Sequence, residues 1–290
     1  MSDWLRPLAN LLHFAGLALA VGAVVLRFAL VNRSGLTVTE RGPAERDLAK
    51  YGFAGAIGVL LAVPFAALAQ ALGLAFPGDP LLPLLRQVLT TTDAGRAIAL
   101  QGVWAAAMAF AFSVARLGPQ RGWTFAAVTV TVSAIVVALR GHAAATDPRL
   151  PAQVATVLHV LGAGAWIGGL FHLWRIARKA SEATLVRLLE NFHGIALGGV
   201  TLVVASGLWH VWTLVDTPVE LVTTGWGRLL VAKLVVLAGV ARLGYRHWRG
   251  GEARVLAGDR AALRQSFARE LQLAAVVFVL TAALTSTSPR

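Results

Sequence analysis

Long apolar runs recur along the chain and constrain its fold more than any single motif. The run from Leu11 to Leu30 holds only His13 and Arg27 as polar side chains. Because a helix of about 20 apolar residues spans the hydrocarbon core of a bilayer, such runs indicate membrane-spanning helices. We predict an all-α polytopic membrane protein with eight such helices, at about residues 8–30, 51–75, 96–115, 123–141, 152–174, 193–215, 227–247 and 268–286.

The charged residues agree with this class and predict its orientation. Hydrophobic residues make up 57% of the sequence and charged residues 14%, which leaves no segment long enough for a separate soluble domain, so we expect residues 1–290 to form one transmembrane domain. The formal charge of +12 arises mainly from Lys and Arg in the loops after the first, third, fifth and seventh helices. This alternation indicates membrane topology rather than nucleic-acid binding. By the positive-inside rule those loops are cytoplasmic and both termini face outward.

Two sequence echoes predict an internal repeat. The first helix contains LLHFAGLALAVG and the fifth VLHVLGAGAWIG, so the pattern His-x2-Gly-x5-Gly occurs in both. TTDAGRAIAL at the third helix resembles TTGWGRLLVA at the seventh. We therefore expect two parallel four-helix halves, at about residues 8–141 and 152–286, whose glycines permit close helix contact. In such an arrangement His13 and His159 are symmetry mates that face each other across the interface.

The histidines divide into two levels of the membrane. His13, His142, His159 and His210 fall toward the outer side, whereas His172 and His193 fall toward the cytoplasm. His159 and His172 are about 20 Å apart along one helix, so they cannot share one metal ion. Imidazole is a good ligand for copper, zinc and haem iron, and we predict a metal site from the outer group. The alternative for each histidine is an interhelical hydrogen bond, and a carbonyl contact is the simpler interpretation of His172.

Two further ionisable residues lie near predicted spans. Lys233 lies inside the seventh helix, where its side chain is expected to extend toward the membrane surface, with an ion pair as the alternative. Glu270 lies at the cytoplasmic end of the last helix. The chain has no cysteine and shows no nucleophile triad, phosphate-binding loop or metalloprotease motif, so enzymatic activity is not predicted.

A set of motifs in order resembles the CopD/PcoD copper-resistance family. It comprises Gly141-His142-Ala143, LHVLGAGAWIGGL from Leu158, GRLLVAKL from Gly227 and FARELQLAAVVFVLTAALTSTSP from Phe267. The resemblance implies an eight-helix bacterial inner-membrane protein with periplasmic termini that moves copper from periplasm to cytoplasm. It implies copper, membrane lipid and a periplasmic copper-binding protein as partners. It matches His13, His142 and His159 to the family's histidines and Glu270 to its acid before the last helix.

Two functions of different classes remain open from the sequence. In the first, copper binds outside at His13, His142 and His159, together with His210, and passes inward between the halves. In the second, the protein is a b-type di-haem cytochrome in which His159 and His172 pair with His210 and His193. A third interpretation is a copper sensor or chaperone-docking protein that transports nothing.

Overall fold

The protein is an elongated bundle of long helices. The structure is a computed structural model that describes residues 4–31, 36–141 and 147–287, and within these ranges the chain forms helices and no strand. The helices are α1 (Leu5–Val25), α2 (Val38–Leu72), α3 (Leu81–Thr91), α4 (Asp93–Arg116), α5 (Gln120–Ala138), α7 (Arg149–Ala163), α8 (Gly169–Ala177), α9 (Glu182–Leu214), α10 (Glu220–Thr223), α11 (Gly225–Leu256) and α12 (Arg260–Leu284), with π-helical turns η1 (Leu26–Val31) and η2 (Gly164–Gly168).

Seven of the predicted spans lie in helices that are long and apolar enough to cross a membrane. The predicted span 227–247 lies in α11, which is helical throughout but is not among the seven, because Arg228, Lys233 and Arg242 interrupt its apolar stretch. The multi-pass all-α class is thus confirmed, and the count of eight stays a prediction. The short helices α3 and α10 were not expected from the apolar runs. Large apolar side chains are exposed along several long helices, as contact with lipid requires, among them Val103, Phe110, Leu197, Leu208 and Val235.

Polar caps fix where several helices begin. The side-chain oxygens of Thr92 and Thr224 accept hydrogen bonds from Gly95 N and Gly227 N at the starts of α4 and α11. The same bond at both positions satisfies one of the free amides of each first turn. These caps lie in the two TT-x-x-GR stretches, so the two stretches are similar in local structure as well as in sequence.

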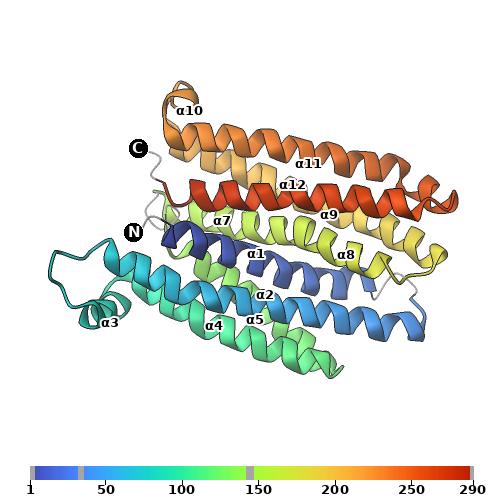
Figure 1. Ribbon diagram of the computed structural model, residues 1–290, viewed down its shortest axis with the longest axis horizontal. Coiled ribbons are helices and arrows are strands. Elements are labelled where there is room, and N and C mark those ends of the chain that lie inside the picture. Colours follow the sequence, from blue (N-terminus) through green and yellow to red (C-terminus); the bar gives the residue numbers. More distant parts are fainter. Residues whose placement is uncertain (1–3, 32–35, 142–146, 288–290) are drawn as a thin grey trace.

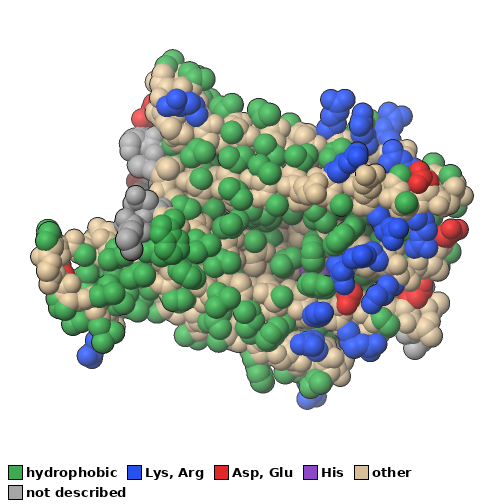
Figure 2. All heavy atoms as spheres, in the orientation of Figure 1, with side chains coloured by type: hydrophobic (Ala, Val, Ile, Leu, Met, Phe, Trp, Pro, Cys, Tyr) green, Lys and Arg blue, Asp and Glu red, His purple; other side chains and the backbone are tan. Residues whose placement is uncertain are grey.

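Helix α1 lies at the centre of the bundle. It packs against α2 and α5 on one side and against α7, α8 and α12 on the other, and Figure 1 shows α11 and α4 at opposite edges with α1 between them. Helix α1 begins and α12 ends at the same end of the bundle. Figure 2 shows that Lys and Arg side chains gather at the opposite end.

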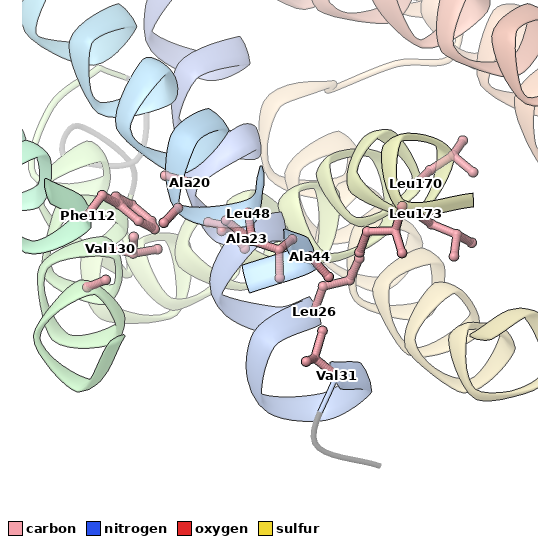
Figure 3. Packing of buried hydrophobic residues seen from close by; sticks show 14 of the residues in the cluster. Ala20, Ala23, Leu26, Val31, Ala44, Leu48, Phe112, Val130, Leu170 and Leu173 are labelled. Carbon is pink, nitrogen blue, oxygen red and sulfur yellow. The ribbon is translucent and has the colours of Figure 1, made fainter. Parts of the chain in front are cut away.

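Small and large apolar residues fill the core around α1. Figure 3 shows Ala20, Ala23 and Leu26 on the central helix, with Leu48 from α2 and Leu173 from α8 beside them. All five are fully buried. The alanines of α1 let the neighbouring helices approach closely, and burial of the larger side chains contributes the apolar stabilisation.

The closest approach joins α1 to the π-helical turn η2. A Cβ on Gly22 would lie 2.2 Å from the carbonyl carbon of Gly168, and a Cβ on Gly168 would lie 1.9 Å from Ala18 O. Only glycine fits on either side of this crossing. Gly22 and Gly168 occupy the same place in the two copies of the His-x2-Gly-x5-Gly pattern, so the predicted contact between the two helices through their glycines is confirmed.

The other glycine of each copy also has a matching environment. A Cβ on Gly16 would lie 2.5 Å from Gly55 O of α2, and a Cβ on Gly162 would lie 2.8 Å from Gly199 O of α9. Each patterned helix therefore packs through glycine on the helix that follows it. The contacts correspond, although the assignment of two parallel repeats stays a prediction.

We predict that Gly168→Ala destabilises the protein because the added methyl group overlaps the backbone of α1. The expected loss is at least about 1–3 kcal/mol, the usual cost of overpacking a filled core. Gly198→Ala on α9 is the matched control, because nothing lies within 4 Å of its Cβ position. Thermal unfolding in detergent should show a lower Tm for Gly168→Ala only, and equal Tm values would contradict the close crossing.

Candidate functional site: the outer cavity

A cavity of about 540 Å³ opens among α1, α7, α9, α11 and α12. It lies toward the end where α1 begins and α12 ends, away from the end rich in Lys and Arg. We call it the outer cavity. Most of its wall is apolar, and its ionisable or imidazole side chains are those of Arg6, Arg140, His159, His210 and Lys233. Two of the four predicted outer histidines thus share one wall.

His159 of α7 is held by a hydroxyl group. Its Nδ1 lies 3.0 Å from Ser206 Oγ. The Ser206 hydroxyl itself donates to the carbonyl oxygen of Leu202 one turn earlier. With the single proton of the Ser206 hydroxyl used in the bond to Leu202, Ser206 can only accept from the His159 Nδ1–H, which is the tautomer we assign. This tautomer makes Nε2 the nitrogen with the lone pair, which is the arrangement of a metal-ligating histidine whose other nitrogen donates to a fixed partner.

His210 of α9 is held in the reciprocal way. Its Nε2 lies 3.3 Å from Thr156 Oγ1, and Thr156 donates to Ala152 O at 3.0 Å. Thr156 therefore accepts from the His210 Nε2–H, and Nδ1 is the nitrogen with the lone pair. A hydroxyl on α9 fixes the imidazole of α7, and a hydroxyl on α7 fixes the imidazole of α9.

The two rings lie close enough to share one ion. Their centres are 6.2 Å apart with an interplanar angle of 70°. A metal ion bonded at about 2 Å to a nitrogen of each ring holds the ring centres roughly 5–6 Å apart. The observed separation of the ring centres lies just above this range.

His13 has a different environment. It is buried, and its Nδ1 lies 3.2 Å from Arg140 Nη2. A guanidinium can only donate, so Nδ1 accepts and the proton of the neutral ring is on Nε2. Nε2 is buried without a hydrogen-bond partner, and His13 is not among the described residues that line the outer cavity. Neither nitrogen of His13 offers a lone pair to that space, and the structure does not bring His13 and His159 together there.

The inner histidines do not form a comparable site. His172 is buried, its Nε2 donates to Leu19 O of α1 at 2.9 Å, and its ring packs edge-on against Tyr51 and Phe171. The carbonyl contact considered from the sequence is therefore the one observed. His193 is half-buried on α9. Across residues 4–31, 36–141 and 147–287, no group of three or more histidine or acidic side chains is placed to hold a metal.

The remaining predicted site residues have separate positions. His142 lies outside the described residues, although Gly141 before it lines the outer cavity. Lys233 also lines the cavity and is half-buried, and the extension of its side chain toward the membrane surface stays a prediction. Glu270 is buried within α12, where its Oε1 lies 3.3 Å from the Cβ position of Gly244 on α11; because α12 begins at Arg260, Glu270 lies inside this helix rather than at its end.

Sequence reasoning missed Ser206 and Thr156. Their signal was present, since Ser206 precedes His210 by four residues and Thr156 precedes His159 by three. At these spacings each hydroxyl shares a helix face with the histidine that follows it. On two antiparallel neighbours the pairs T-x-x-H and S-x-x-x-H then face each other. Only the three-dimensional pairing of α7 with α9 shows that the bonds cross between helices.

The fold and the cavity define a multi-pass helical membrane protein with an imidazole pair in a pocket. Two family models match the chain: Copper resistance protein D-like, N-terminal domain, over residues 1–152, and Copper resistance protein D over residues 186–284. The chain belongs to the copper resistance protein D family. No curated protein and no solved structure gave a significant match. The resemblance drawn from the motifs is thereby confirmed, and it associates the protein with copper and the membrane.

We predict that diethyl pyrocarbonate modifies His159 and His210 much faster than His172. The first two line the cavity, whereas His172 is enclosed and uses Nε2 in a hydrogen bond. Reaction at an enclosed imidazole requires local opening, so its rate should be lower by about tenfold or more. Peptide mass spectrometry of the folded protein in detergent measures each rate. Equal rates for His159 and His172 would show that the cavity is not open to small reagents.

Proposed function

We propose that the protein binds copper in the outer cavity through His159 and His210 and carries it across the membrane. The single observation that supports this most is the reciprocal hydrogen bonding with Ser206 and Thr156, which gives each ring a defined tautomer and one acceptor nitrogen. A histidine kept only for packing needs no such pairing. Family membership supports copper as the metal.

A third ligand is proposed from the segment after α5. Gly141 is a residue of the cavity wall, and the next residue in the sequence, His142, carries a further imidazole. With His142 the site would have three nitrogen donors, a set that suits copper. His13 is left out of the proposed site because Arg140 faces its acceptor nitrogen.

The side of the membrane that the outer cavity faces is proposed from the charge distribution. If the end rich in Lys and Arg is cytoplasmic, as the positive-inside rule requires, the outer cavity opens toward the periplasm of a bacterial inner membrane. Copper would then move inward along the interface where α1 crosses η2. We also propose that the two halves are parallel repeats related about this interface, because Gly22 and Gly168 meet there and Gly16 and Gly162 have matching contacts.

The di-haem alternative has less support. It requires His172 as an axial ligand, but Nε2 of this residue is bonded to Leu19 O and its ring is enclosed by aromatic side chains. A bound haem would have to displace this packing. The absorption spectrum of purified protein tests the point, since a Soret band with reduced-minus-oxidised alpha bands would overturn the copper proposal in its present form.

We predict that His159→Ala and His210→Ala each weaken copper binding by at least about tenfold, because each removes one of the few donors. Ser206→Ala should weaken it by about 10–100-fold, since it releases the Nδ1–H that orients His159. His193→Ala, on the same helix as His210 but outside the cavity, is the matched control. Copper titration in detergent measures the affinities. His13→Asn distinguishes the two possible sites. If this variant keeps the copper affinity of the wild type, the proposed pair is supported. If it loses copper affinity while His159→Ala keeps it, the site lies at His13 instead.

Transport requires its own measurement. In proteoliposomes the wild-type protein should accumulate copper over empty vesicles, and the variant with both His159→Ala and His210→Ala should not. His193→Ala should match the wild type. Copper that binds to purified wild-type protein but never enters the vesicles would favour a sensor or docking function over transport.

A further inference from the structure

The outer cavity has an electrostatic character that does not suit a bare metal cation. Its described lining includes three cationic side chains, Arg6, Arg140 and Lys233, and neither aspartate nor glutamate. A cation-binding site is ordinarily lined by carboxylates or at least flanked by them. A copper ion in this cavity would therefore gain nitrogen ligands and at the same time be repelled by its surroundings.

Lys233 is the most informative of the three. It lies within α11 and lines the cavity. Within the described part of the chain no carboxylate pairs with it and no hydrogen bond to it is found. It lines the same cavity as His159. A lysine at membrane depth is costly unless a counter-charge is present, so the site calls for an anion.

A copper ion in this cavity also needs an anionic ligand. Two imidazoles leave coordination positions open in the tetragonal nitrogen and oxygen geometry typical of Cu(II). A carboxylate oxygen suits that position, and a second carboxylate oxygen of the same molecule can accept from an ammonium group.

We infer that copper enters the outer cavity as a complex with a small carboxylate, and that Lys233 binds this carboxylate. The inference rests on the proposed copper site, and it specifies the substrate class as an anionic or neutral copper carboxylate rather than the hydrated ion. The ligand charge offsets the metal charge, so the complex no longer meets the repulsion of the cavity. His159 and His210 supply nitrogen donors to the metal, while Lys233 and the apolar wall select the ligand.

The test uses purified full-length protein in detergent and equilibrium dialysis with Cu(II) and radiolabelled malonate. The wild type should retain about one malonate for each copper, as one shared complex requires. Lys233→Met, which keeps the length of the side chain but removes its charge, should lower retained malonate by about tenfold, and Lys233→Arg should restore most of it. Arg228→Met is the matched control, because Arg228 lies on the same helix but is exposed and outside the cavity.

A second measurement separates charge from damage to the fold. Without malonate, and at equal free copper, Lys233→Met should bind Cu(II) several-fold more tightly than the wild type, because a repelling charge has been removed. A misfolded variant would instead bind Cu(II) more weakly both with and without malonate. Malonate that fails to raise copper retention by the wild type, or Lys233→Met that retains as much malonate as the wild type, overturns the inference and leaves the copper site standing. Absence of copper binding in both conditions overturns the proposed function and the inference together.

Discussion

The crossing of α1 and η2 at Gly22 and Gly168 is the contact on which the arrangement of the bundle depends. The two backbones meet at distances that exclude any side chain, so α1 can lie between the two groups of helices and pack against both. With α1 held there, α7 is fixed beside it, and α9 is fixed against α7 through Gly162 and Gly199. The outer cavity is the space left where these helices spread toward the end at which α1 begins.

The two patterned helices share a motif but differ in the environment of its histidine. Under the proposed repeat, Gly55 corresponds to Gly199, so Ser206 and His210 correspond to Ala62 and Ala66 of α2. The first half therefore lacks both the hydroxyl that orients the ring and the second imidazole. His13 instead meets a guanidinium that occupies its lone pair. Within the proposed repeat, one histidine of the pair contacts a hydroxyl group of the neighbouring helix, while the other accepts a hydrogen bond from Arg140 after the end of α5.

The sequence predicted the features that depend on one helix at a time. Apolar runs located the helices, and the glycine pattern anticipated a close crossing because Gly22 and Gly168 carry no side chain wherever they pack. It could not predict which histidines converge, because this depends on the rotation of each helix about its axis. A difference of one residue turns a side chain by about 100°. His13 was thus grouped with His159 by depth, whereas packing turned it toward Arg140 and brought His210 to His159 instead.

The donor set of the cavity also bears on how a bound ion could leave it. The chain has no cysteine, and Met108, the only methionine after the first residue, is fully buried in α4 and not part of the cavity wall. Thiolate and thioether ligands would hold Cu(I) tightly, and their absence leaves nitrogen donors and whatever oxygen ligand the ion brings with it. Conduction requires binding weak enough for release. In the proposed site, two imidazoles beside the positive charge of Lys233 would meet this requirement, since removal of the accompanying anion would leave the copper ion repelled by Lys233.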